Sequence, residues 1–243
     1  MFDCSLTMAQ GVMMWKDGKS KQVFLTELDS ITFFPSVEHE YVDLGLPSGT
    51  LWATMNIGAT SPEDYGDYFA WGEVWGYNSA KRYFAWDSYK WCKGSNTSLT
   101  KYCLSSGYGD VDGKDMLDLE DDAANANWGE EWQIPSVEQM DELQDTCYTK
   151  WTWIKRDGIN GYEIKSLKNE KIIFLPATGY YIYGKLTSAG DYGNYWLCTL
   201  NNNNQAQATC MAFYSNIMGK KESDRYIGRS VRAVRVKKAN IHD

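Results

Sequence analysis

Few side chains in this sequence have the types and spacing that enzymatic chemistry needs. The chain has 243 residues and only two histidines, His39 and His242, which lie in a predicted linker and next to the C-terminus. A nucleophilic Ser–His or Cys–His pair needs an imidazole inside the domain. We therefore predict that the protein is not an enzyme and has no catalytic residues.

Adjacent carboxylates, Asp121-Asp122 and Glu130-Glu131, are the next candidates for chemistry. Two acids hydrolyse a glycoside only when the fold holds them about 5 to 10 Å apart across a sugar cleft. Acidic side chains also favour the first turn of a helix, where backbone N–H groups are unpaired, and this explains Asp121 and Asp122 more simply. A glycan-processing enzyme remains the third hypothesis about function.

Patterns that would bind a metal or cofactor are weak. The loop from Asp110 to Asp115 gathers carboxylates, but its glycine is not at the sixth position that an EF-hand requires. The six cysteines form no CxxC pair, which argues against a structural zinc site. Cys92 and Cys103 could close a small loop in an exported protein, or remain free buried thiols. We predict no metal site and no cofactor.

The residues best suited to binding gather between 179 and 216. Tyrosine offers a large contact area with few rotatable bonds, whereas Asn, Ser and Gly supply adaptable hydrogen bonds and turns. Solvated turns and sheet edges have the same composition, so a purely structural role for these residues remains the alternative. Trp196, flanked by strand residues, is expected to be core. The predicted ligand-binding residues are Tyr180, Tyr181, Tyr183, Asp191, Tyr192, Asn194, Tyr195, Asn201, Asn202, Asn203, Asn204, Gln205, Gln207, Tyr214 and Asn216.

Composition excludes several kinds of partner. Hydrophobic residues make up 43% and charged residues 23%, as in a globular protein. No apolar run approaches the roughly 18 residues of a spanning helix, so we predict no transmembrane segment. The formal charge of −8 should repel nucleic acid. Most of the eleven tryptophans are expected to consolidate a loop-rich core.

The first residues, Met1-Phe2-Asp3-Cys4, lack the basic start and apolar segment of a signal peptide. Two options follow. Either the protein is cytoplasmic, or the sequence begins after a signal that has been removed.

The elements that must position these residues are mostly short strands and long loops. Asp17-Gly18 between apolar runs predicts a hairpin within residues 11–34, in an N-terminal appendage of residues 1–36. The main domain is expected to span residues 41–238. Its two predicted helices run from about Val137 to Cys147, opened by the capping box Ser136 to Gln139, and from Glu120 to Gly129. Residues 172–175 and 230–236 are predicted to be strands.

A set of motifs in the main domain carries a resemblance. In order they are Val42 to Thr54 (VDLGLPSGTLWAT), Tyr65 to Glu73 (YGDYFAWGE), Leu119 to Ala124 (LEDDAA), Trp132 to Ser136 (WQIPS), Ile173 to Ala177 (IFLPA) and Gly228 to Arg232 (GRSVR). Together they resemble the Fibrobacter-type major paralogous domain, an expanded family of exported Bacteroidetes proteins.

That family is more distantly similar to the C-type-lectin-like fold of formylglycine-generating enzymes and of the variable proteins of diversity-generating retroelements. Two segments carry this second similarity, Trp132 to Met140 and the ending Gly228-Arg229-Ser230-Val231-Arg232. In the first segment, Gln133 and Met140 replace the usual Arg and Trp. The resemblance implies an α+β, C-type-lectin-like fold with short strands, two helices and long loops, preceded by the N-terminal β-hairpin.

The resemblance also implies a function. In retroelement-diversified relatives, a Tyr- and Asn-rich segment ahead of a fixed last strand forms the ligand surface. Our first hypothesis is thus a non-enzymatic, exported cell-surface or secreted protein that binds a protein or glycan through residues 180–216. Whether this segment is diversified can be read only from nucleotides. The second hypothesis is a structural or adhesive module that forms oligomers through its N-terminal hairpin.

Overall fold

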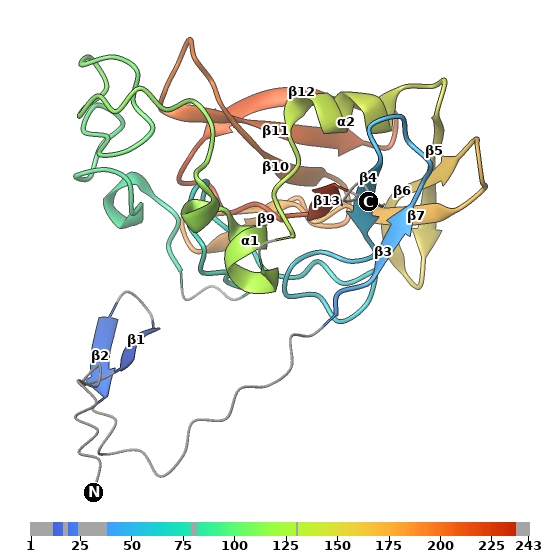
Figure 1. Cartoon of the computed structure of the whole chain (residues 1–243), viewed down its shortest axis with the longest axis horizontal. Helices are drawn as coiled ribbons and strands as arrows, with labels where there is room; N and C mark the ends of the chain where they lie inside the picture. The colour runs from blue at the N-terminus through green and yellow to red at the C-terminus, as the bar shows by residue number, and fades with distance from the viewer. Residues whose placement is uncertain (1–11, 17–18, 24–37, 79–81, 130, 237–243) are drawn as a thin grey trace, which may run out of the picture. The chain divides into compact units, whose positions relative to one another are not determined.

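The computed structural model describes residues 12–16, 19–23, 38–78, 82–129 and 131–236. The chain divides into two compact units, residues 1–38 and 39–243, which are considered separately below. In the first unit, β1 (Val12–Lys16) pairs antiparallel with β2 (Lys19–Val23), so a hairpin flanks Asp17-Gly18 as predicted (Figure 1). The rest of the predicted hairpin segment, from residue 24 to 34, lies outside the described residues.

The second unit is a mixed but strand-rich fold with long loops. In the part that the structure describes, its strands form sheets in the orders β10-β11-β12, β13-β4-β3, β5-β6-β7 and β8-β9. Two short 3₁₀ turns, Trp86–Ser88 and Leu119–Asp121, interrupt the loops. The strands are β3 (Tyr41–Asp43), β4 (Thr50–Ala53), β5 (Thr149–Arg156), β6 (Ile159–Ser166), β7 (Ile172–Pro176), β8 (Tyr180–Ile182), β9 (Lys185–Thr187), β10 (Gly193–Leu200), β11 (Gln207–Tyr214), β12 (Ile217–Asp224) and β13 (Val234–Val236).

The last strand closes the unit against one of its first strands, as the sequence predicted. β13 pairs with the middle strand β4, Val234 opposite Trp52, and the two lie together near the centre of Figure 1. The regular strand is shorter than predicted, because it covers residues 234–236 rather than 230–236. Residues 231–233 leave the ladder at the point where the Arg232 side chain turns into the core.

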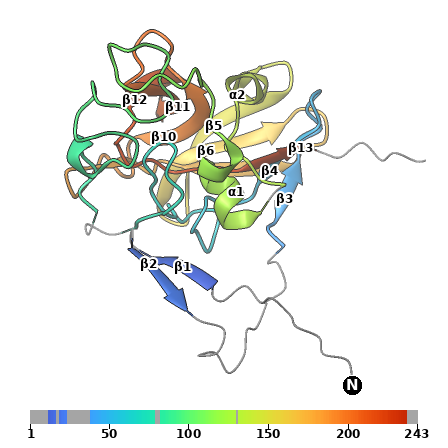
Figure 2. The same ribbon diagram turned by 60° about the vertical axis from the view of Figure 1, so that its left-hand side comes forward.

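In the sheet β10-β11-β12, β10 and β11 are buried on both faces, whereas most of β12 is exposed or half-buried. One face places Trp196 and Cys210 in a core cluster with Trp71. The other face places Tyr195 and Phe213 against β6, β7 and α2 (Val137–Gln144). Figures 1 and 2 show α2 beside this sheet. Because both faces of β10 and β11 are covered, these two strands are a fixed support for the segments at their ends.

Both predicted helices are present, with corrected bounds. In α2 the Ser136–Gln139 capping box forms and Met140 and Leu143 are buried, as expected. The helix ends at Gln144 rather than Cys147, because the Leu143 carbonyl accepts hydrogen bonds from Thr149 Oγ1 (2.5 Å) and Trp151 Nε1 (2.9 Å) instead. The described residues hold no helix long and apolar enough to cross a membrane.

The second predicted helix is split. Residues 119–121 form a 3₁₀ turn, and α1 runs from Ala123 to Trp128. Asp122 separates them and is the N-cap, because its Oδ1 accepts from the N–H groups of Ala124 and Asn125. Its Oδ2 accepts from Ile134 N (2.8 Å) and so ties the helix start to the following loop.

Asp122 is expected to make the protein less stable as the pH rises from about 4 to 6. Burial raises its pKa from 3.8 to about 6, although its three backbone hydrogen bonds oppose this. The folded state therefore binds the proton more tightly than the unfolded state, and stability falls across this window by about 2–3 kcal/mol. Urea denaturation at several pH values of the wild type and of Asp122→Asn measures this slope. An unchanged slope in the variant would contradict the assignment.

Candidate functional site

The predicted ligand-binding residues divide by exposure. Trp196, predicted to be core, is fully buried. Tyr183, Asp191, Asn202, Asn203, Tyr214 and Asn216 are exposed; Tyr180, Tyr192, Asn201, Asn204 and Gln207 are half-buried; Tyr181, Asn194, Tyr195 and Gln205 are buried.

Three of the four buried residues have structural roles, so their prediction as surface residues is wrong. Tyr195 lies in the core and donates to the Pro176 carbonyl (2.6 Å). Tyr181 packs edge-on against Tyr68. Gln205 Oε1 accepts from the N–H groups of residues 104 and 105 and so holds a loop against the sheet.

The exposed residues do not form one surface, because they lie at opposite ends of the β10-β11-β12 sheet. Asn201 to Asn204 form the turn between β10 and β11, where Asn201 Oδ1 accepts from the N–H groups of Asn203 and Asn204. Tyr192 and Tyr214 lie at the other end. Eight-residue strands separate the two ends by about 25 Å. The Asn run therefore acts as a capped turn, apart from the tyrosines.

Tyr180, Tyr192 and Tyr214 form what we call the tyrosine cluster. The ring centroids of Tyr192 and Tyr214 lie 4.5 Å apart, and those of Tyr180 and Tyr192 lie 6.1 Å apart at a steep angle. The three rings come from β8, from the loop before β10 and from the end of β11. Tyr214 is 42% exposed. The cluster is thus a partly open aromatic surface assembled from three segments.

Close packing around two glycines brings these tyrosines together. Gly193 lies opposite Phe213, and a Cβ at Gly193 would overlap the Phe213 ring. This approach places Tyr192 and Tyr214, the neighbours of these two residues, side by side. Gly179 donates to the Tyr192 carbonyl (2.6 Å) and has a positive φ of 66°, where a Cβ would collide with the 187 carbonyl.

Beneath the tyrosine cluster lie Asn194 and Arg229, both buried. The Arg229 guanidinium lies over the Trp196 ring at 4.9 Å and the Tyr180 ring at 5.7 Å, and Nη2 donates to Ser223 Oγ. Burial raises the pKa of the Tyr192 phenol, and the positive charge of Arg229 opposes that rise. The site therefore combines aromatic rings with a buried cation.

Sequence reasoning missed Arg229 as a site residue. It belongs to the Gly228-Arg229-Ser230 motif, which was interpreted only as part of a closing strand. Its backbone pairs with Phe69, and the preceding Gly228 pairs with Tyr181 of β8. The available signal was the recurrence of arginine at 225, 229, 232 and 235, which is unusual for a core segment.

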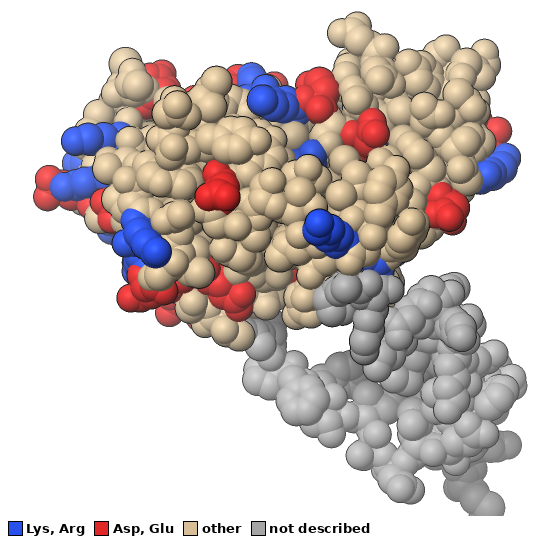
Figure 3. All heavy atoms as spheres, turned by 180° about the vertical axis from the view of Figure 1, so that it is seen from behind, with Lys and Arg blue, Asp and Glu red and all other residues tan. Residues whose placement is uncertain are grey.

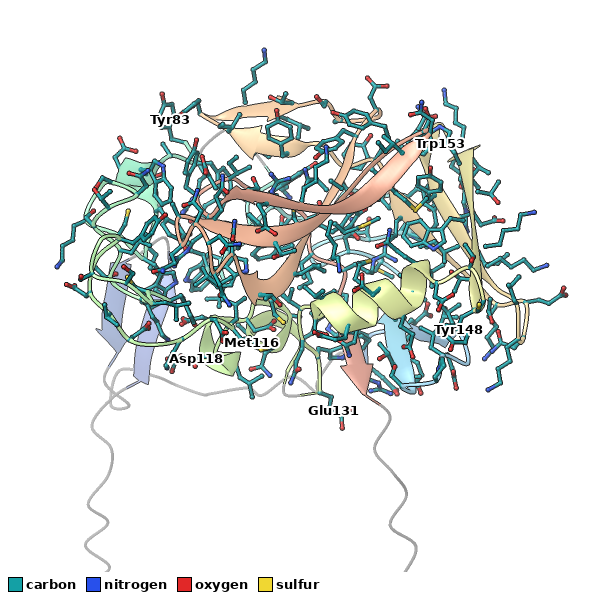
Figure 4. The ribbon with its side chains drawn as sticks, turned by 90° about the horizontal axis from the view of Figure 1, so that it is seen from above. Tyr83, Met116, Asp118, Glu131, Tyr148 and Trp153 are labelled. Atoms are coloured by element: carbon teal, nitrogen blue, oxygen red, sulfur yellow. The ribbon has the colours of Figure 1, made fainter. Side chains whose placement is uncertain are left out.

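A second aromatic group, of which sequence reasoning predicted only Tyr183, lies at the far end of β8. The rings of Tyr83 and Tyr183 are 5.6 Å apart and each side chain is 55% exposed. The Tyr183 hydroxyl lies 3.3 Å from that of Tyr226. Figure 4 shows Tyr83 beside the β8–β9 hairpin, on the edge that is seen face-on in Figure 3, where uncharged surface predominates. This face suits a ligand without a high density of charge.

The clustered carboxylates that could bind a metal or act in catalysis form ion pairs and hydrogen bonds within the protein instead. Asp118, Glu120 and Asp121 bring carboxylate oxygens within 4.8 Å of one another. The Lys101 ammonium lies among them, at 2.7, 3.0 and 2.5 Å respectively. In the loop from 110 to 115, Asp112 accepts from the N–H groups of residues 102 and 103 at 2.8 Å. These carboxylates therefore hold loops together.

The cysteines of the described part of the chain are all free. Cys92 and Cys103 do not form the loop-closing disulfide that the sequence left open; Cys92 Sγ donates to the Trp86 carbonyl (3.0 Å) and Cys103 Sγ to that of Ser105 (3.2 Å). Burial raises the pKa of Cys198 to about 11, so this thiol stays protonated at neutral pH. Cys4 lies outside the described residues.

Comparisons with known proteins give no relative. No protein-family profile, no curated protein and no solved structure matches this chain. The geometry of the site therefore carries the functional argument.

Proposed function

We propose that this protein is a non-enzymatic, exported binding protein that recognises its ligand through the tyrosine cluster. The observation that carries the proposal is the convergence of Tyr180, Tyr192 and Tyr214, partly exposed, at one end of β10 and β11, two strands that are buried on both faces. These strands hold the backbone that carries the rings in place before the ligand arrives, which lowers the entropy lost on binding.

The chemistry of the cluster fits recognition rather than turnover. Tyrosine rings present flat apolar faces while their hydroxyls form hydrogen bonds, and they lose few rotamers on binding. The described part of the chain places no histidine near the cluster, because His39 stacks on Trp128 at 4.0 Å. Among the described residues, no histidine is therefore placed to act as a general base at the tyrosine cluster.

The proposal includes the family that the sequence resembles. Three features support the Fibrobacter-type resemblance and a C-type-lectin-like arrangement: a last strand paired with β4, a helix opened by the Ser136 capping box, and a tyrosine-bearing segment between β7 and that last strand. In such proteins the binding surface stands on a frame of this kind. Diversification of the segment is a question for the encoding nucleotides.

Replacing both Tyr192 and Tyr214 with alanine is expected to weaken ligand binding by about 10- to 100-fold, since two aromatic anchors are lost. The melting temperature should change little, because Tyr214 is exposed and Tyr192 is half-buried. Binding of the labelled full chain to an array of glycans and to an array of secreted proteins measures the effect.

The matched control replaces Asn202 and Asn203, exposed at the opposite end of the same sheet, with alanine. Its binding should equal that of the wild type. If the asparagine variant loses binding and the tyrosine variant keeps it, the site lies at the other end of the sheet and the proposal fails.

A further inference from the structure

Three arginines of the closing segment, Arg225, Arg229 and Arg232, are at least 95% buried. A buried guanidinium is costly unless its N–H groups have acceptors. In Arg225 and Arg232 every guanidinium nitrogen has one. Arg225 donates to Tyr89 Oη, to the Tyr102 and Gln205 carbonyls, and to the Lys101 carbonyl. Arg232 donates to Asn56 Oδ1 and to the carbonyls of Ala53, Thr54 and Phe174.

Arg229 differs from these two. Nη2 donates to Ser223 Oγ, but Nε and Nη1 are buried without an acceptor in the described part of the chain. No carboxylate of residues 38–78, 82–129 or 131–236 forms an ion pair with this guanidinium. Two hydrogen-bond donors of Arg229 therefore have no acceptor among the described residues, and its charge faces the Trp196 and Tyr180 rings instead of a carboxylate.

Asn194 adds a second unmatched group at the same place. Its side chain is fully buried, and neither Oδ1 nor Nδ2 makes a hydrogen bond of normal geometry. The amide lies near enough to the Tyr192 hydroxyl to help hold down its pKa, which burial raises and Arg229 also lowers. Arg229, Asn194 and Tyr192 thus surround one polar site beneath the tyrosine cluster.

We propose that Arg229 and Asn194 form the anion-binding part of the site and bind the carboxylate of an acidic sugar whose ring lies on the tyrosine cluster. The proposal rests on the proposed function and names its ligand class. A carboxylate oxygen that accepts from Nε–H or from Nη1–H, which lie on different edges of the guanidinium, forms a short charge-assisted hydrogen bond. The Asn194 amide provides both a donor and an acceptor for a neighbouring hydroxyl.

A uronic acid fits the surroundings better than a polyanion or a peptide. One buried cation matches one carboxylate, whereas the net charge of −8 repels a dense run of negative charge. A pyranose ring has an apolar C–H face, which complements the electron-rich face of tyrosine. Nε and Nη1 are closed to solvent here, so a carboxylate reaches them when a tyrosine ring turns aside. Movement of a ring in the tyrosine cluster is then part of ligand binding.

The test compares galacturonate, which carries a single carboxylate, with its methyl ester, in which the charge is removed and a methyl group is added. Calorimetric titration of the full chain should show the free acid binding about 10- to 100-fold more tightly than the ester. Arg229→Met should remove this preference while leaving the melting temperature equal to or above that of the wild type, because an unmatched buried charge is replaced by an apolar side chain.

Equal affinity for acid and ester, or a preference that survives in Arg229→Met, overturns the proposal. Poly-glutamate binding as tightly as galacturonate overturns the choice of a sugar. A variant that melts well below the wild type shows that Arg229 is structural and also overturns it. None of these results bears on the Tyr192 and Tyr214 double variant, whose binding to the arrays tests the proposed function independently.

Discussion

Replacing Arg232 with methionine is expected to lower the free energy of unfolding by about 3–5 kcal/mol, since the change removes a buried cation that satisfies several buried acceptors. The acceptors are Asn56 Oδ1 (2.9 Å) and the carbonyls of Ala53 (3.1 Å), Thr54 (3.1 Å) and Phe174 (2.9 Å). Methionine fills part of the volume but donates nothing. Urea denaturation at neutral pH, followed by tryptophan fluorescence, measures the loss.

The position of Arg232 explains the size of this effect. Its carbonyl acceptors come from the end of β4 and from β7, two sheets that share no strand. Burial lowers the pKa of Arg232 to about 10, so the side chain remains charged at neutral pH. The guanidinium therefore joins two sheets through hydrogen bonds to backbone carbonyls of both.

Arg235→Met is the matched control for Arg232→Met. Arg235 lies three residues later, is 19% exposed and pairs with the half-exposed carboxylate of Glu131 at 2.9 Å. The loss should be below about 1 kcal/mol, as for most surface ion pairs. If Arg232→Met costs no more than Arg235→Met, the carbonyls find other donors and Arg232 does not join the sheets.

The same segment shows what sequence patterns could predict. Alternating apolar residues in Val231-Arg232-Ala233-Val234 correctly predicted a chain end that packs on the sheet. A regular alternating strand would place Arg232 on the face opposite the apolar side chains, but Arg232 is 1% exposed. Whether a buried arginine is stable depends on carbonyls that are distant in sequence, at residues 53, 54 and 174, and no local pattern contains that information.

Local signals were reliable where a single turn or cap decides the structure. The Ser136–Gln139 capping box and the apolar run at 172–175 needed only neighbouring residues, and both elements are present. The end of α2 was missed because it depends on Thr149 and Trp151, which take the Leu143 carbonyl from the next strand. Helix ends that are set by tertiary contacts are not visible in a helical repeat.

Composition found part of the candidate site but could not sort its members. Tyr195 and Tyr214 have the same side chain, yet Tyr195 is 1% and Tyr214 42% exposed. β10 is covered on both faces, so the alternation that usually separates inside from outside is absent. Arg229 was missed for a related reason: its environment is formed by β8, β10 and β12, which meet only in the folded chain.

Replacing Lys101 with methionine is expected to lower the free energy of unfolding at neutral pH by about 2–4 kcal/mol, because it leaves a buried carboxylate without its counter-charge. Lys101 is 14% exposed and contacts Asp118, Glu120 and Asp121, of which Asp121 is 3% exposed. Burial alone would lower the pKa of Lys101, but the hydrogen bonds to these carboxylates outweigh it and raise that pKa. Chemical denaturation at pH 7 measures the loss.

The effect of Lys101→Met should shrink in acid. The hydrogen bond from Lys101 lowers the pKa of Asp118, whose contribution to stability is complete above its unfolded value of 3.8 and is lost as the pH falls through the folded value. The wild type loses that contribution as the pH falls below 3.8, so the difference in free energy of unfolding between wild type and variant narrows. Lys114→Met removes an exposed partner of the same Asp118 and should cost under about 1 kcal/mol. A Lys101→Met deficit that is small at pH 7, or that stays constant down to pH 3, would mean that the three carboxylates are held apart by their loops and do not depend on the ammonium.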